Sequence, residues 1–245
     1  MSARWTGPRA LVGLGLVLLL SMAVGAALLR PARTGGIAPR PKAQRPPLML
    51  LTSLPLVFGE KLSLDNGGSP ALTALETRYR VIPIAVADAP SLDQRSLLLM
   101  AHAAAQPAEN LVVLDRWVRS GGRLLLLADP AVEWASERLA GDNLRPSPMF
   151  PDTGLLAHWG LRLDAPERRG DVERKLGGRT ITARSPGELQ GRCAISADRF
   201  VAQCRLGRGR AIVVADADFL DTAHLSSSEN NLSGLLSTLA TLEQK

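Results

Sequence analysis

Five polar side chains follow predicted strands at the points where those strands end, and they are the candidates for chemistry. They are Ser53, His102, Asp129, Asp216 and Asp218. Open α/β sheets bind ligands outside the carboxyl ends of their strands. A histidine near aspartates can act as an acid and a base, so His102, Asp129 and Asp216 suggest a hydrolase as one alternative. Aspartates at strand ends also close turns and cap helices, and we favour this structural interpretation.

A second group of ligand-type residues follows the last predicted strand. Asp216, Asp218, Asp221 and His224 are spaced by two, three and three positions. Their oxygens could coordinate Ca²⁺ or Mg²⁺, but the segment lacks the glycine and the terminal glutamate of a calcium-binding loop. The sequence also has no nucleophile elbow, phosphate-binding loop, dinucleotide fingerprint, H-E-x-x-H motif or C-x-x-C motif. We therefore expect no metal, no cofactor and no enzyme activity.

The two cysteines lie on the two arms of a predicted hairpin between residues 192 and 206. With Asp198-Arg199 as a two-residue turn, counting outward places Cys193 opposite Cys204. Directly opposed residues bring their Cβ atoms into the range of a disulfide, which we therefore predict. The alternative is two buried thiols one register apart. A metal pair is not expected, because no other cysteine exists and no histidine is near in sequence.

The clearest structural unit that could position these residues is Gln106–Pro130. Leu111, Leu114 and Val118 recur at helical spacing and predict an amphipathic helix. Two glycines, Gly121 and Gly122, end that helix. The run that follows, residues 123–128, is apolar without alternation, which is typical of a strand covered on both faces.

Strands and helices alternate along the rest of the chain. Further strands are expected at 48–54, 80–86, 97–101, 161–163, 179–183 and 211–215, and further helices at 70–79, 134–140, 155–159 and 230–242. Pro83 places the 80–86 strand at a sheet edge. This alternation predicts an α/β fold with a mostly parallel open sheet and helices on both faces, plus a β-hairpin insertion near residues 179–206.

Composition predicts a packed core and excludes a nucleic-acid-binding protein. The chain has 245 residues, of which 46% are hydrophobic, and its formal net charge is +6. Seven of the 29 basic residues and none of the acidic residues fall within residues 1–45, so the remainder is close to neutral. Aromatic residues make up only 4% of the chain, which leaves little for stacking on bases.

The N-terminus contains an uncharged apolar run, Ala10–Leu29, whose 20 residues match the thickness of a bilayer. Small residues at 24–26 could mark a cleaved signal peptide, but we favour a signal anchor because the run continues to Leu29. More basic residues follow the run than precede it, and the positive-inside rule alone would place 30–45 in the cytoplasm. We expect a cytoplasmic tail (1–9), a transmembrane anchor (10–29), a Pro/Arg-rich linker (30–47) and an exported domain (48–245). The predicted location is the bacterial inner membrane, single-pass, with the main domain in the periplasm.

Three segments together resemble a known group of proteins. They are Leu48–Leu54, Leu114–Pro130 and Gly207–Thr222, the last followed by a leucine-rich helix that begins near Asn231. Their pattern is similar to the exported domain of the auxiliary proteins of ABC-type transport systems, a group that includes gliding-motility-associated components. Those domains resemble class I glutamine amidotransferases, so the resemblance implies a flavodoxin-like sheet. Neither cysteine of this chain lies between a strand and a helix, so the amidotransferase nucleophile is not carried over.

The resemblance implies a non-catalytic auxiliary protein that contacts the membrane or ATPase subunits of an ABC transporter, with the bilayer itself as a partner through residues 10–29. The hydrolase built on His102, Asp129 and Asp216 is the first alternative. A polysaccharide- or ligand-binding module, with Trp134 or Trp159 exposed for stacking, is the second. The hydrolase requires its three side chains to meet around a pocket, whereas the auxiliary role leaves them closing turns.

Overall fold

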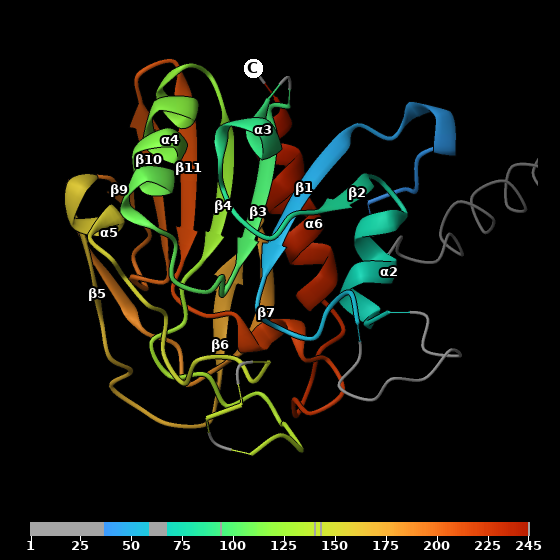
Figure 1. The fold of residues 1–245 in the computed structure, drawn as a ribbon. Helices are drawn as coiled ribbons and strands as arrows, with labels where there is room; N and C mark the ends of the chain where they lie inside the picture. Colours follow the sequence, from blue (N-terminus) through green and yellow to red (C-terminus); the bar gives the residue numbers. More distant parts are fainter. Residues whose placement is uncertain (1–36, 59–67, 94, 140, 143, 245) are drawn as a thin grey trace, which may run out of the picture. The chain divides into compact units, whose positions relative to one another are not determined.

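The computed structural model describes residues 37–58, 68–93, 95–139, 141–142 and 144–244. The chain separates into two units, Met1–Gly36 and Ile37–Lys245, and every described residue belongs to the second. Its main sheet contains β1 (Pro47–Thr52), β2 (Arg80–Pro83), β3 (Leu97–Ala101), β4 (Arg123–Leu127), β9 (Ala194–Ile195), β10 (Val201–Leu206) and β11 (Gly209–Val214). The strand order is β2-β1-β3-β4-β11-β10-β9 (Figure 1).

The sheet is mostly parallel, as predicted. β2, β1, β3, β4 and β11 run parallel to one another, and β10 pairs in the antiparallel sense with both β11 and β9. All five residues of β3 are buried, as are the four leucines of β4, because both faces of the central strands are covered. β2 lies at the edge, where the missing N–H of Pro83 breaks no ladder hydrogen bond.

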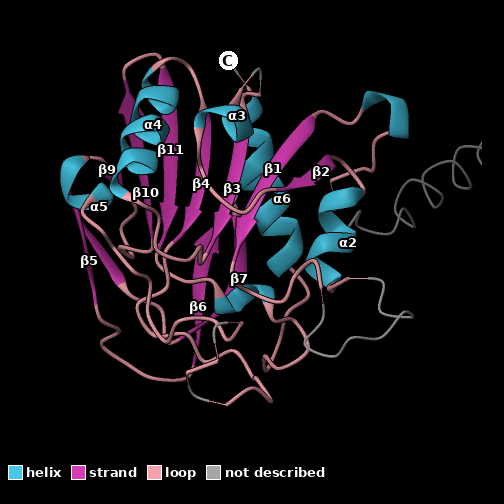
Figure 2. Cartoon of the chain, in the orientation of Figure 1, coloured by secondary structure: helices cyan, strands magenta, loops and turns pink. Residues whose placement is uncertain are grey.

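Helices cover both faces of this sheet, which confirms the flavodoxin-like α/β prediction (Figures 1 and 2). One face carries α3 (Ala89–Leu92), α4 (Ala108–Arg119) and α5 (Leu155–His158), and the other carries α2 (Pro70–Glu76) and α6 (Asn231–Glu243). Short 3₁₀ helices span Lys42–Gln44 (η1) and Asp218–Leu220 (η2). Leu114 and Val118 form the buried stripe of α4, and Leu235 and Leu239 belong to that of α6.

Two further pairs of strands extend the domain beyond the main sheet. β5 (Leu161–Asp164) pairs with β8 (Glu188–Gly191), and β6 (Asp171–Leu176) pairs with β7 (Arg179–Arg184). The two-residue turn Gly177–Gly178 has φ values of +56° and +78°, the left-handed geometry of a tight hairpin turn. The insertion predicted near 179–206 thus begins earlier in the chain. β6 escaped prediction because four of its six residues are charged, and only Val172 and Leu176 are apolar.

The helix predicted at 134–140 is wrong for the described residues 134–139, which form a loop. Two side chains accept hydrogen bonds from backbone N–H groups in and next to this segment. Asp218 accepts a hydrogen bond from the N–H of Glu133, and the Ser136 hydroxyl accepts one from the N–H of Arg138. These local and tertiary bonds compete successfully with a short helix.

The predicted membrane anchor and localisation require a correction. No helix in the described part of the chain is long and apolar enough to cross a membrane; the longest, α6, has 13 residues. The anchor predicted at 10–29 lies outside the described residues. A single-pass protein of the inner membrane with a periplasmic domain is therefore not supported.

The described part of the predicted linker, residues 37–47, packs on the domain. The Arg40 guanidinium forms an ion pair with Glu243 of α6 at 2.7 Å, and it lies 5.6 Å from the centre of the Tyr79 ring. The N–H of Arg40 also donates to the carbonyl of Thr77. The folded domain therefore begins about ten residues before the first strand.

Candidate functional site

The predicted strand-end residues do gather at one edge of the sheet. Registers across the middle of the sheet place Thr52 beside Ala101, Ala101 beside Leu127, and Leu127 beside Val214. Ser53 and His102 follow their strands directly, whereas Asp129 and Asp216 follow theirs by two residues. The four parallel strands therefore deliver their polar residues to the same carboxyl edge.

Three of these residues form a compact carboxylate cluster, which we define as Asp129, Asp216 and Asp218. One carboxylate oxygen from each lies within 4.8 Å of the others. Asp129 and Asp216 are 0% exposed and Asp218 is 2% exposed. Charges this deeply buried require compensation, since an unpaired carboxylate in a protein interior is costly.

Backbone N–H groups supply most of that compensation around Asp129. Its Oδ1 accepts from the N–H of Ala131 at 2.8 Å, and its Oδ2 accepts from Ala217 at 2.9 Å and from the N–H of Asp218 at 3.3 Å. Asp129 therefore ties the loop after β4 to the loop after β11, which are far apart in sequence. This is the turn-closing role favoured from the sequence, extended across two strands.

Asp216 and Asp218 bind the neighbouring loops in the same way. Asp216 accepts from the N–H of Arg184 at the end of β7 at 2.9 Å and from that of Phe219 at 3.3 Å. Asp218 Oδ2 accepts from the N–H of Glu133 at 2.6 Å. Its Oδ1 has no hydrogen-bond partner among the described residues. Among the carboxylate oxygens of the cluster, it is the one left without a partner in the described part of the chain.

The carboxylate cluster also retains protons. Burial is the main cause that raises the pKa of Asp216 well above its usual value, and the negative charges of Asp129 and Asp218 add to it. Burial and the charge of Asp129 raise the pKa of Asp218 to about 8. Near neutral pH Asp218 is therefore held largely in the neutral form, and the raised pKa of Asp216 favours its neutral form as well, which lowers the repulsion within the cluster.

His102 is buried beside this cluster but is not poised as a base. Its ring is 0% exposed, and its Nε2 donates to the carbonyl oxygen of Ser147 at 2.9 Å, so Nδ1 carries no proton. Nδ1 has no partner in the described part of the chain. Burial lowers the pKa of His102, although the charge of Asp129 acts in the opposite direction. The residue has a φ of +45°, a left-handed conformation that ends β3.

Ser53 lies on the same edge without joining the carboxylate cluster. Its hydroxyl and its N–H both donate to the carbonyl oxygen of His102. It lines a cavity of about 960 Å³ together with Leu54, Val57 and Ile84. None of the other four predicted site residues lines any of the described cavities.

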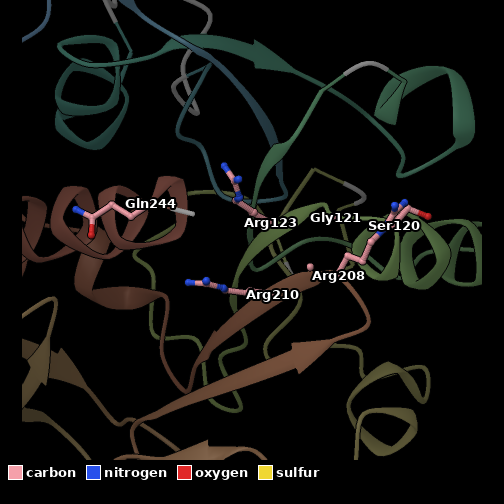
Figure 3. A pocket seen from close by; sticks show the side chains of 7 residues that line it. Ser120, Gly121, Arg123, Arg208, Arg210 and Gln244 are labelled. Carbon is pink, nitrogen blue, oxygen red and sulfur yellow. The ribbon is translucent and has the colours of Figure 1, made fainter.

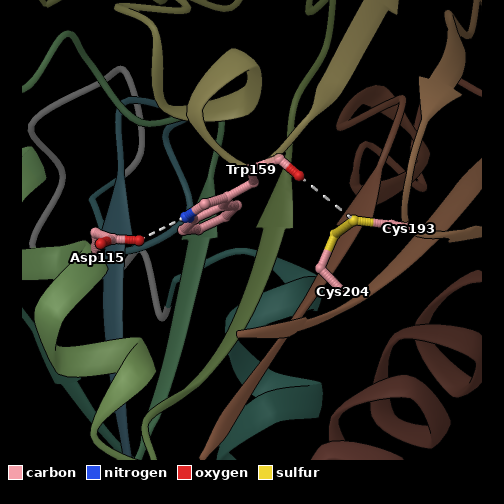
Figure 4. The surroundings of a disulfide bond; sticks show 4 residues. All are labelled: Asp115, Trp159, Cys193 and Cys204. Carbon is pink, nitrogen blue, oxygen red and sulfur yellow. Dashed lines mark hydrogen bonds between the residues drawn. A yellow bond between two sulfur atoms is a disulfide. The ribbon is translucent and has the colours of Figure 1, made fainter. Parts of the chain in front are cut away.

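The disulfide prediction is confirmed. Cys193 and Cys204 are bonded, with their Cα atoms 4.8 Å apart. The observed pairing of β9 with β10, Ala194 opposite Gln203, continues to this pair, as counting from the turn predicted. Figure 4 shows the bond beside Trp159, whose carbonyl oxygen lies 3.9 Å from the Cys193 sulfur. Because an oxidised sulfur carries no hydrogen, we interpret this approach as packing.

Trp159 itself is part of the structure and does not form a stacking surface. It is 5% exposed, and its indole N–H donates to Asp115 of α4 at 2.8 Å (Figure 4). Trp134 is half-buried and packs against the core. The expected exposed tryptophan rim is therefore absent at Trp159, and the polysaccharide alternative loses its main support.

Sequence reasoning missed the residues that complete this edge. Asn231 is 1% exposed, and its side-chain amide binds both the N–H and the carbonyl of Thr182 in β7. Ser147, the partner of His102, lies in a proline-containing loop whose position no local pattern indicates. An asparagine where an apolar helix begins is a recognisable pattern. That pattern suggests a helix cap, however, and not the buried contact with β7 that Asn231 makes.

Comparison with known proteins shows the fold and nothing finer. No family model and no curated protein sequence matches the chain. Among solved structures, the mmIFT52 N-terminal domain is similar with a TM-score of 0.52 at 12% identity, over 81% of this chain and 97% of that domain. This likeness supports the α/β fold described above.

Two further solved structures are more distant. Cytoplasmic protein STM1381 from Salmonella typhimurium LT2 has a TM-score of 0.49 at 10% identity, over 80% of this chain and 99% of that protein. The exo-β-1,4-mannosidase Op5Man5 from Opitutaceae bacterium strain TAV5 has a TM-score of 0.47 at 14% identity, over 94% of this chain. The chain spans only 39% of the length of that mannosidase.

Proposed function

We propose that this chain is a non-catalytic binding module that serves as an auxiliary component of an ABC-type transport system. The observation that supports the non-catalytic part is the state of the carboxyl edge. His102, Asp129 and Asp216 are fully buried, and their polar atoms hold loops together. A hydrolase at this edge would need at least one of them to reach a substrate from a cavity.

The transporter assignment depends on the sequence resemblance. The segments that carry it correspond to β1, to α4 with β4, and to β11 with η2, followed by α6. β1, β4 and β11 belong to the middle of the sheet, and α4 and α6 cover its two faces. The resemblance is therefore carried by the core of the domain rather than by its variable loops.

Reciprocal purification tests the transporter assignment. The tagged full chain is purified from cells, and the tagged ATPase subunit of each ABC system found with it is purified in turn. We expect both the ATPase and the membrane subunit of one system in stoichiometric amounts with this chain, identified by mass spectrometry. Recovery of the tagged chain alone, or of each tagged ATPase subunit without this chain, would contradict the proposal.

An activity screen tests the non-catalytic part separately. The full chain is assayed on ester, glycoside and phosphate-ester substrates alongside His102→Gln, with Ser53→Ala as the control for a polar change at the same edge. We expect no turnover that His102→Gln removes. Turnover lost in His102→Gln but kept in Ser53→Ala, with both variants folded, would establish the hydrolase instead.

A further inference from the structure

The amino edge of the sheet carries a row of arginines that the proposed function does not use. The tight turn at Gly207–Arg208 places Arg205 of β10 opposite Arg210 of β11. The parallel register places Arg210 beside Arg123 of β4. Residues paired in this way on adjacent strands point to the same face of a sheet. We call Arg205, Arg210 and Arg123 the arginine row.

Three arginines side by side on neighbouring strands repel one another, which destabilises the sheet unless an anion compensates their charge. Neighbouring strands lie only about 5 Å apart, and like charges directly opposite one another destabilise a sheet. Arg205 and Arg210 are exposed and Arg123 is half-buried, so the three side chains extend from the strands toward the surface. An anion placed between them would turn this repulsion into attraction.

The acidic groups near the arginine row are already engaged. The Arg123 guanidinium donates to the carbonyl oxygen of Glu243 at 3.2 Å, while the carboxylate of Glu243 is paired with Arg40 at 2.7 Å. Asp115 is paired with Arg119 at 2.8 Å. Within the described residues, no ion pair involves any member of the row.

A cavity of about 650 Å³ opens where the arginine row meets the end of α6. Arg123, Arg208 and Arg210 line it together with Ser120, Gly121 and Gln244. Figure 3 shows Arg123 and Arg210 extending to the same side, toward Gln244, whereas Arg208 reaches toward Ser120. Arg210 also lines a second cavity of about 510 Å³, which includes Arg205 and Arg192. These sizes suit a small ligand rather than a flat protein surface.

The wall of this cavity is held in place by backbone contacts. The N–H of Arg208 donates to the carbonyl of Arg119 at the end of α4 at 2.9 Å. A side chain at Gly209 would overlap the carbonyl oxygen of Val118, and one at Gly207, whose φ is +58°, would crowd that of Arg119. The hairpin therefore sits directly on α4, which fixes the backbone positions from which its arginine side chains extend.

From these observations we infer that the arginine row and its cavity bind a small anion that bears at least two adjoining phosphate groups. A guanidinium donates two parallel hydrogen bonds to a phosphate. The three guanidiniums come from three neighbouring strands and line two cavities that share Arg210, so more than one anionic group is needed to engage them all. The inference does not depend on the proposed transporter role. Free polyphosphate and the triphosphate of a nucleotide share this chemistry.

Calorimetric titration of the full chain at low ionic strength tests the inference. The probes are tripolyphosphate, ATP, orthophosphate and citrate. We expect tripolyphosphate to bind at least tenfold more tightly than orthophosphate or citrate, with affinity falling as salt rises. Tighter binding of ATP than of tripolyphosphate would assign a nucleotide, and the reverse would assign free polyphosphate. Equal affinity for citrate, or no binding of any probe, would overturn the inference.

Three variants locate the site. Arg210→Gln removes the central charge and should weaken tripolyphosphate binding about tenfold, because one charge-assisted contact is lost. Arg205→Gln serves as a second variant with an exposed side chain and should weaken binding less. Arg168→Gln removes the same charge from an exposed loop outside both cavities and should leave binding unchanged. Equal effects of Arg205→Gln and Arg168→Gln would show that the row is not the site.

Discussion

At the carboxyl edge of the sheet, Asp129, Asp216 and Asp218 are buried and accept hydrogen bonds from backbone N–H groups. At the amino edge, the arginine row faces a cavity and no carboxylate in the described residues neutralises it. The strands that meet both edges are the same, β4 and β11. The difference lies in the loops, since the segments after β4 and β11 fold over the acids whereas a tight turn leaves the arginines open. Buried acids with internal partners serve the fold, and open charges without a carboxylate partner are available to a ligand.

Of the substitutions that this comparison suggests, Asp129→Ala should cause the largest loss of stability. The change leaves three N–H groups without an acceptor, those of Ala131, Ala217 and Asp218. We expect the free energy of unfolding to fall by about 3 kcal/mol or more. Urea titration followed by circular dichroism measures it, with exposed Glu167→Ala as the control. A loss below about 1 kcal/mol would mean that the carboxylate cluster does not hold these loops.

Removing the disulfide should cause the next largest loss of stability. Cys193 and Cys204 are 11 positions apart, and closing a loop of that length stabilises a protein by up to about 3 kcal/mol. The hairpin hydrogen bonds already hold the two arms together, so we expect about 2 kcal/mol for the Cys193→Ser/Cys204→Ser pair. Unfolding with and without a reductant checks this, because the reductant should affect the parent chain and not the double variant.

The pH dependence of stability tests the protonated state of the carboxylate cluster. Burial raises the pKa of Asp218 to about 8, from an ordinary value of 3.8 for an aspartate. Between these values the folded state binds more protons than the unfolded state, so this contribution is complete below about pH 4 and is lost as the pH rises through 8. We expect Asp218→Asn, which cannot ionise, to gain about 4 kcal/mol relative to the parent between pH 5 and pH 8.5, at about 1.4 kcal/mol for each pH unit up to 8.

That comparison is made as a difference between the two proteins at each pH. Burial lowers the pKa of His102, so its contribution makes the protein less stable as the pH falls below the ordinary pKa of a histidine. This contribution is present in both proteins and cancels in the difference. A constant difference across the range would show that Asp218 is ionised in the folded protein, and the buried-acid account of the carboxyl edge would then fail.

The smallest expected effect on stability is that of a substitution in the arginine row at the amino edge. Arg210→Gln should stabilise the chain by about 0.5 kcal/mol at low salt, because it relieves repulsion with Arg205 and Arg123. The gain should disappear in high salt, where screening already weakens the repulsion. Thermal unfolding at two salt concentrations measures it. A loss of stability instead would assign Arg210 a structural role like that of the acids.

Local patterns in the sequence were sufficient for much of the fold. The spacing of Leu114 and Val118 located α4, the unbroken leucines of 124–127 located a doubly covered strand, and Pro83 located the sheet edge. Counting from one turn was enough to pair Cys193 with Cys204. Each of these depends on residues close together in the chain, where periodicity and steric rules act directly.

The burial of the candidate site residues and the formation of the arginine row could not be predicted in the same way. The strand-end positions of His102 and Asp129 were correct, but their burial depends on Ser147 and on Phe150, whose N–H donates to the Asp129 carbonyl from a loop without regular pattern. The arginine row required the register of β11 beside β4, which joins residues 87 positions apart. Tertiary contacts of this kind leave no periodic trace in the sequence.

The two ends of the strand order also limit how the domain can associate. At one end β9 has only two residues and is fastened to β10 by the disulfide, and at the other β2 has four residues and ends in Pro83. Neither offers the long row of free N–H and C=O groups on which another chain could build. A second copy or a partner that approaches the main sheet is therefore expected to engage helices, loops or side chains rather than to extend that sheet.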